Sequence, residues 1–123
     1  MGRFSPGKRP GLSLLTHNWG AFIIVVARGE IDADNAERLD GYLRTLPEAD
    51  LLIDAWDVTA CDAAGVAALT AAKQRADESG WGIAIVADRD GPVVKALRAD
   101  PSGRKISTFA DRRVARIALQ HAS

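Results

Sequence analysis

The spacing of apolar and polar residues changes several times along the chain, and each change predicts a different element. Residues 12–16 and 21–28 are dominated by apolar and β-branched side chains, which favour extended strands. Asn18 and Gly20 stand between the two runs and suit a tight turn. We therefore predict a β-hairpin at the start of the ordered chain.

After this hairpin the apolar residues recur at spacings of three and four, as on one face of a helix. The residues concerned are Ala36, Leu39, Leu43 and Leu46, and charged side chains fill the positions between them. Asp34, followed three residues later by Glu37, resembles a capping box, and Pro47 would stop the helix. An amphipathic helix bounded by these residues is predicted.

A second helix is predicted over residues 63–79, with Asp62 as its N-cap and Gly80 at its end. Before it, residues 51–53 form a short unbroken apolar run, typical of a central strand covered on both faces. Residues 54–61 are then expected to form the loop between this strand and the helix.

The remaining pattern predicts two strands and two helices. The strands are expected at residues 82–87 and 106–109, and a short helix between them starts at Pro92 and ends by Pro101. The last helix should carry Val114, Ile117 and Ala118 on its apolar side and its arginines on the other.

The resulting element order, ββαβαβαβα, indicates the α/β class. Strands that alternate with helices imply a mixed, mainly parallel β-sheet, here with an N-terminal hairpin and about four α-helices. The 123 residues, 47% of them hydrophobic, suit one hydrophobic core. We expect a flexible leader at residues 1–11 and one domain at residues 12–120.

Charge is segregated along a chain whose net charge is zero. Residues 1–29 hold four basic and no acidic side chains, residues 30–90 hold five and fourteen, and residues 91–123 hold seven and two. Such asymmetry shapes the encounter with charged partners. Because no basic run is interleaved with aromatic residues, direct binding of nucleic acid is not expected.

The chain offers no sign of export or membrane insertion. Its longest apolar run, residues 21–27, is far shorter than the roughly 20 residues that span a bilayer, and the first ten residues lack the apolar stretch of a signal peptide. We therefore expect a cytoplasmic protein. One cysteine and two distant histidines make no zinc-ligand pattern, so no metal is predicted.

Three short segments carry the most information about function. They are Gly29-Glu30-Ile31-Asp32, Leu51-Leu52-Ile53-Asp54 and Asp62-Ala63-Ala64-Gly65. With the element order, they resemble the STAS domain family, the anti-sigma factor antagonists of bacteria and their relatives. The resemblance extends over about residues 12–119 and implies the STAS-like fold.

The resemblance also implies a function. Members of the family are regulators without a catalytic centre, and many bind a kinase-type anti-sigma factor of the histidine-kinase-type ATPase class. They dock through the loop and helix start that correspond here to residues 57–66. The chain is accordingly expected to be no enzyme, to need no cofactor, and to act by binding a protein.

At one point the chain departs from the family pattern. The family has Asp-Ser-Ser-Gly at the helix start, and its second serine accepts the phosphate that prevents docking, whereas this chain has Ala63 and Ala64. Ala64 is thus a lost phosphoacceptor position, because alanine has no hydroxyl. Thr59 and Thr70 are the nearest substitutes, although a capping or buried role suits Thr59 better and Thr70 reads as an ordinary helix residue.

The resemblance and the positions of the residues together give a candidate partner-binding set. It consists of Asp32, Asp57, Thr59, Asp62, Ala63, Ala64 and Gly65. For Asp62 the alternative is a purely capping role, and for Asp32 it is hydrogen bonding within its own loop. Trp56 either anchors a partner or covers the core. Cys61 is either a redox switch or a small buried side chain.

The sequence is also compatible with other functions. Some STAS proteins without the serine are subunits of ABC transporter ATPases or of larger signalling assemblies. A receiver-like phosphoacceptor is a further alternative, because acidic residues that could hold magnesium follow two strands: Glu30, Asp32, Asp34, Asp54 and Asp57. However, this chain lacks the hydroxyl residue and the lysine that a receiver domain requires at the ends of later strands. The apolar helix faces would also allow a dimer.

Overall fold

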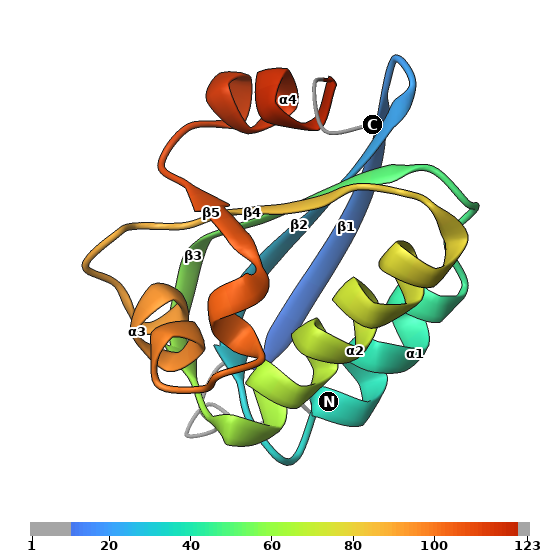
Figure 1. Cartoon of the computed structure of the whole chain (residues 1–123). Coiled ribbons are helices and arrows are strands. Elements are labelled where there is room, and N and C mark those ends of the chain that lie inside the picture. The colour runs from blue at the N-terminus through green and yellow to red at the C-terminus, as the bar shows by residue number, and fades with distance from the viewer. Residues whose placement is uncertain (1–10, 121–123) are drawn as a thin grey trace, which may run out of the picture.

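The computed structural model of the chain describes residues 11–120, so nearly all of the predicted leader lies outside the described residues. Five strands and four α-helices alternate after an initial hairpin (Figure 1). In chain order they are β1 (Leu12–Trp19), β2 (Phe22–Ile31), α1 (Ala36–Arg44), β3 (Asp50–Cys61), α2 (Ala63–Ser79), β4 (Ile83–Val86), α3 (Pro92–Arg98), a 3₁₀ turn (Gly103–Lys105), β5 (Ser107–Phe109) and α4 (Arg112–Gln120).

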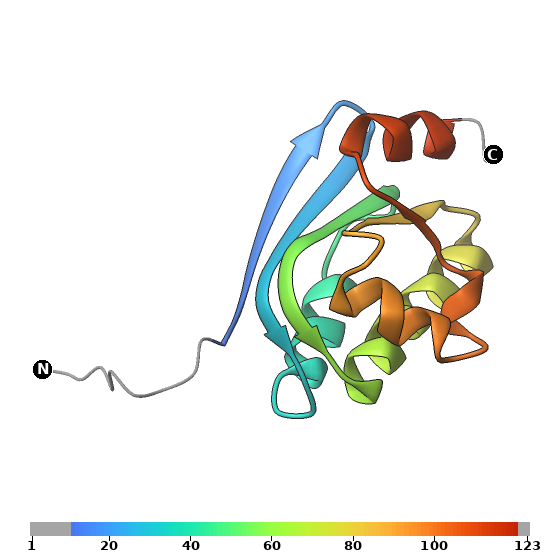
Figure 2. The ribbon, with the colours of Figure 1, turned by 90° about the vertical axis from the view of Figure 1, so that its left-hand side faces the viewer.

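The strands form one sheet in the order β1-β2-β3-β4-β5, with β1 at its outer edge (Figure 2). β1 and β2 are antiparallel, and the other neighbouring strands are parallel. A two-residue turn joins β1 to β2, and Gly20 adopts a φ of +65° there, which glycine tolerates without strain. The predicted fold class, including the hairpin and the four helices, is confirmed.

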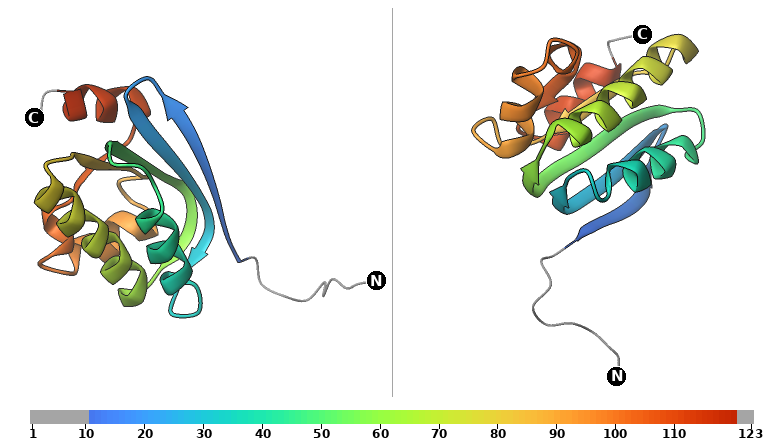
Figure 3. Two further views of the ribbon diagram at one scale, coloured as in Figure 1. Left: turned by 90° about the vertical axis from the view of Figure 1, so that its right-hand side faces the viewer. Right: turned by 90° about the horizontal axis from the view of Figure 1, so that it is seen from below.

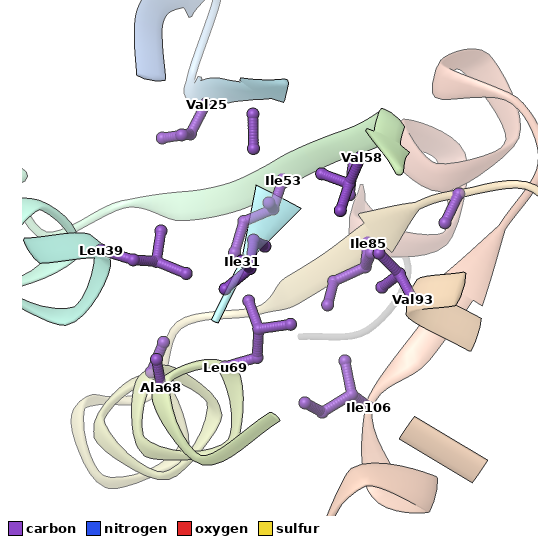
Figure 4. Close-up of a cluster of buried hydrophobic side chains, with 14 of the residues drawn as sticks. Val25, Ile31, Leu39, Ile53, Val58, Ala68, Leu69, Ile85, Val93 and Ile106 are labelled. Atoms are coloured by element: carbon purple, nitrogen blue, oxygen red, sulfur yellow. The ribbon is translucent and has the colours of Figure 1, made fainter. Parts of the chain in front are cut away.

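Helices cover both faces of the sheet. α1, α2 and α3 lie on one face and α4 lies on the other (Figures 1 and 3). The larger core, under the three helices, includes Leu39, Ile53, Leu69 and Ile85 (Figure 4). The smaller core joins Phe22, Ile24, Leu52, Ala84 and Val86 to Ala115 and Leu119 of α4. Double coverage explains why buried residues are consecutive in β2 and β4.

β3 is much longer than the predicted strand at residues 51–53. It continues to Cys61 because the ten-residue β2 stays paired beside it, up to the pair Ile31 and Cys61. Two register shifts along this pairing interrupt the alternation of buried and exposed residues, which hides the strand in the sequence. The prediction that residues 54–61 form a loop is therefore wrong.

α1 begins and ends differently from its prediction. Its N-cap position is Asn35 rather than Asp34, and the Asn35 side chain holds the preceding loop instead of the helix. Its Oδ1 accepts a hydrogen bond from the Asp32 backbone N–H at 3.0 Å, and its Nδ2 donates to the Glu30 carbonyl at 2.8 Å. The helix ends at Arg44, so Pro47 is not what stops it.

α4 turns a different side to the sheet than the predicted one. Ala115 and Leu119, four residues apart, are buried, whereas Val114 and Ile117 are 50% and 49% exposed. The prediction grouped Val114, Ile117 and Ala118 by their apolar character alone. The helix instead packs through the two residues that meet the apolar side chains of the sheet.

Two arginines on α4 contact the sheet as well. The Nε of Arg112 lies 2.6 Å from Oδ2 of Asp54, and the guanidinium of Arg116 lies 4.9 Å from the ring centroid of Trp19. The basic C-terminal helix therefore pairs with one acidic side chain of the middle of the chain.

Among the described residues, no helix combines the length and the apolar character that a membrane span requires.

Candidate docking site

Asp62 holds together the start of α2 and the loop between β2 and α1. Its Oδ1 accepts a hydrogen bond from the backbone N–H of Gly65 at 3.1 Å, which confirms the predicted N-cap. Its Oδ2 accepts from the backbone N–H of Ala33 at 3.2 Å, and its own backbone N–H donates to the Ile31 carbonyl at 3.1 Å. One carboxylate thus fixes two segments that are far apart in sequence.

Replacement of Asp62 by alanine should lower the free energy of unfolding by about 1 to 2 kcal/mol, because the helix loses its cap and the loop its anchor. Urea unfolding followed by circular dichroism measures this loss. Asp62→Ser is the matched variant, since a hydroxyl still caps the helix but has one oxygen for two N–H groups. It should lose less, and an Asp62→Ala protein as stable as the wild type would contradict the capping role.

Gly65 lets the first turn of α2 lie directly on the ends of two strands. A Cβ atom at this position would lie 2.7 Å from Cγ2 of Ile31 and 2.9 Å from Sγ of Cys61. Gly65 belongs to the candidate partner-binding set, but it is buried and lies beneath the surface of the site. Gly65 therefore positions the helix start.

The exposed part of the site consists of the helix start and the neighbouring loop, which lie side by side (Figures 1 and 2). Ala63 is exposed and Ala64 is half-buried, while Asp32 is half-buried and is followed by the exposed Ala33 and Asp34. Oδ1 of Asp32 also accepts a hydrogen bond from the Asp34 backbone N–H at 2.9 Å, as in an Asx turn. We call this exposed area, Asp32 to Asp34 with Asp62 to Ala64, the docking site.

Asp57 and Thr59 lie in β3 and not in a loop, which corrects their predicted placement. Oδ2 of Asp57 lies 3.5 Å from Nε of Arg28 in β2, and both side chains are mostly exposed. The hydroxyl of Thr59 donates to the Gly29 carbonyl at 3.3 Å. Trp56, in the same strand, is 48% exposed, so the alternative in which it covers the core is not favoured.

The acidic residues considered for a receiver-like site are not gathered at one place. Asp54 lies in the middle of β3, because the strand continues beyond it, and its carboxylate pairs with Arg112. Within residues 11–120, no three His, Cys, Asp or Glu side chains are grouped so that they could hold a metal ion. The arrangement gives the receiver alternative no support.

Cys61 lies half-buried directly beneath the docking site. Burial, and then the negative charge of Asp62, raise the pKa of the Cys61 thiol to about 11. The thiolate, which is the reactive form, is therefore scarce at neutral pH. The structure thus favours the alternative in which Cys61 is a small packed side chain.

In the folded protein, Cys61 should react with iodoacetamide far more slowly at neutral pH than in the same protein unfolded in guanidinium. The rate should rise steeply in alkaline solution as the thiol ionises. Mass spectrometry after timed quenching measures the labelled fraction. Rapid labelling of the folded protein, or a sulfenic acid after mild peroxide, would show that a redox switch is available after all.

A shallow groove beside the docking site was not foreseen in the sequence. It has a volume of about 450 Å³ and runs between the start of α2 and the end of α3. Its lining combines apolar side chains with two carboxylates: Cys61, Asp62, Ala63, Val66, Ala96, Ala99, Asp100 and Pro101. The only signal in the sequence is the pair of small residues Ala96 and Ala99 on α3, which is too weak to predict a groove.

Comparison with known proteins identifies the family. A family model described as "Mlab, STAS domain" matches residues 20–99, which include β2 to α3 and the whole docking site. None of the curated proteins compared with this chain matches its sequence.

Several solved structures share the fold. A crystal structure of an anti-sigma factor antagonist from Mycobacterium paratuberculosis superposes with a TM-score of 0.78 at 18% identity, covering 89% of this chain and 95% of that one. A putative anti-sigma factor antagonist from Thermotoga maritima gives 0.77 at 13% identity, covering 88% and 95%. The antagonist SpoIIAA in its unphosphorylated form gives 0.62 at 10% identity, covering 90% and 99%. Because the family model spans most of the sheet and its helices, this chain belongs to the STAS domain family.

Proposed function

We propose that this protein is a non-enzymatic regulator that acts like an anti-sigma factor antagonist. In this proposal the docking site binds a cytoplasmic anti-sigma factor of the histidine-kinase-type ATPase class. The observation that carries the proposal is the exposed Ala63 and half-exposed Ala64 at the start of a capped helix, where the family resemblance places the contact with the partner.

The rigidity of the docking site supports a role in binding. Asp62 accepts hydrogen bonds from both segments of the site, so little conformational freedom remains to be lost on association. Surfaces that are already ordered retain more of their contact energy as affinity. A surface of fixed geometry therefore suits recognition of a protein partner.

The charge of the docking site indicates the character of the partner. The exposed Asp62 belongs to the site, and Asp100 lines the adjacent groove. Carboxylates on a recognition surface steer the approach of a basic partner and reject an acidic one. We therefore expect lysine or arginine side chains on the anti-sigma factor to face this site.

We expect that phosphorylation does not control the docking site. No serine occurs in residues 57–66, and the hydroxyls of the two nearby threonines already donate hydrogen bonds, that of Thr59 to Gly29 and that of Thr70 to the Ala67 carbonyl at 3.0 Å. Binding is accordingly constitutive, or it is controlled elsewhere.

The test is to isolate the partner with tagged protein in its native cells and then to measure binding of the purified pair by calorimetry. Recovery of a histidine-kinase-type ATPase, and release of a sigma factor from it, is the expected result. Incubation of the pair with ATP should leave residues 57–70 without phosphate by mass spectrometry. Stoichiometric phosphate in this segment would contradict the absence of a switch.

An ABC transporter ATPase is the second candidate partner. The alanines at positions 63 and 64 are compatible with it, because the family resemblance includes STAS proteins without the serine that serve as subunits of transporter ATPases. The isolation experiment separates the two candidates directly, since the recovered ATPase belongs to one class or the other. Recovery of an ABC-type ATPase would replace sigma-factor control by a role in transport.

A further inference from the structure

β1 leaves one side of its backbone open. It pairs with β2 along its inner edge, and no other strand of residues 11–120 pairs with it (Figures 2 and 3). Its eight residues keep one continuous register with β2, without a bulge. The outer edge of the sheet is therefore long and regular.

Two hydrogen bonds show which backbone groups point outward. The carbonyl of Gly11 accepts from the Glu30 N–H at 3.4 Å and so points toward β2, whereas the carbonyl of Leu12 accepts from Arg38 of α1. Because alternate residues of an edge strand face opposite ways, Leu14, Thr16 and Asn18 also turn their N–H and C=O groups outward. Within the described chain, none of these six groups has a hydrogen-bond partner on this side.

Beyond Leu12, whose carbonyl Arg38 occupies, the residues of β1 lack the features that normally prevent strand addition. Exposed edges are usually protected by charged residues, prolines or bulges. The sequence of β1, LSLLTHNW, contains no lysine, arginine, aspartate, glutamate or proline. Leu15, near its middle, is 45% exposed. This edge is therefore suited to pair with another uncharged strand.

We propose that the β1 strands of two copies of this chain pair in antiparallel fashion about a two-fold axis at Leu15, which joins two sheets into one. Opposite residues must lie on the same face, so Leu15 faces the second copy's Leu15, and Leu14 exchanges hydrogen bonds with the second copy's Thr16. The two leucines then stand about 4.5 Å apart at Cα and cover each other.

The chemistry of the β1 edge favours pairing with the β1 strand of a second copy of this chain. An isologous contact places the same surface on both sides, and an uncharged strand meets its copy without repulsion. Arg38, which holds the Leu12 carbonyl, limits the pairing to residues 13–17. The contact shares no residue with the docking site, so its success or failure is independent of the proposed function.

Sedimentation velocity over a wide range of concentrations tests the pairing. Because a paired edge is narrow, the expected result is a concentration-dependent shift from the monomer mass to twice that mass. Leu15→Lys places two like charges at the axis and should weaken the dimer at least tenfold. Ala21→Lys, with the same added charge at the exposed hairpin turn, should leave the dimer unchanged. Thermal unfolding verifies that both variants are folded.

Cross-linking tests the register. In a Cys61→Ala background, Leu15→Cys should form an intermolecular disulfide under mild oxidation, because the separation at the axis suits one. His17→Cys, on the same face of β1 but away from the axis, should not. A monomer at every concentration, a strand accepted only from a different protein, or cross-linking through His17→Cys instead of Leu15→Cys would each overturn the proposal.

Discussion

Replacement of Ala64 by glutamate should weaken partner binding by about 1 to 3 kcal/mol, or roughly five- to 150-fold in Kd. Ala64 is half-buried at the second position of α2, so a longer charged side chain would stand between the docking site and its partner. Its carboxylate would lose water in the complex and would add to an already acidic surface. Calorimetric titration of the purified ATPase with the variant measures the loss.

The same substitution should not harm the fold. Ala64 packs partly against the larger core, which a longer side chain disturbs, whereas a negative charge in the first turn complements the helix macrodipole, so the free energy of unfolding should change by less than about 1 kcal/mol. Ala21→Glu is the matched control, because Ala21 is exposed at the hairpin turn, at the opposite end of the sheet. It should bind like the wild type. If Ala64→Glu also binds like the wild type, α2 does not begin within the interface and the proposed docking site is wrong.

Replacement of Gly29 by alanine should destabilise the protein by about 2 to 4 kcal/mol. Gly29 has a φ of +104°, a backbone conformation that favours glycine. An added Cβ would also collide with the carbonyl oxygen of Gly11, which is backbone and has little freedom to move aside. The pairing of β1 with the end of β2 would have to open. Urea unfolding monitored by circular dichroism measures the change.

Gly41 offers a control with the same chemical change. It lies in the middle of α1, is exposed, and an added Cβ would meet nothing within 4 Å. Since glycine is a poor helix former, Gly41→Ala should stabilise the protein by up to about 1 kcal/mol. Opposite signs for the two variants are the expected result. A Gly29→Ala protein as stable as the wild type would mean that the strand end adapts without strain.

Local signals in the sequence predicted those elements whose ends are determined locally. α2 is the clearest example: Asp62 caps its first turn and Gly80, with a φ of +82°, ends it in the left-handed conformation, as predicted. The element order and the sheet class followed from the same kind of pattern. These features depend on residues that are close together in the chain.

β3 and α4 were predicted less well because their limits depend on distant residues. β3 continues through Asp57 and Thr59 since β2 is there to pair with it, and the register shifts hide its alternation. The buried side of α4 is set by where the sheet offers Leu52 and Ala84, not by which of its residues are apolar. Burial of a helix face is decided by its neighbours.

The docking site also combines a feature that local sequence predicts with features that depend on distant residues. The position of Asp62 before a helix was predictable, but its second hydrogen bond, to Ala33, joins residues that are 29 apart and leaves no local trace in the sequence. The groove that includes Ala63, Ala96 and Pro101 likewise exists only because the start of α2 and the end of α3 come together in the fold.

The order of the strands in the sheet has a consequence for how the chain assembles. Because the spatial order β1 to β5 repeats the order in the sequence, no strand must be inserted between two that have already paired. The β1 and β2 hairpin can form first, on a timescale of about microseconds, and each later strand then adds to the edge left by the one before it. The same direction of growth suits a chain emerging from the ribosome, where the strand just synthesised always meets its partner already in place.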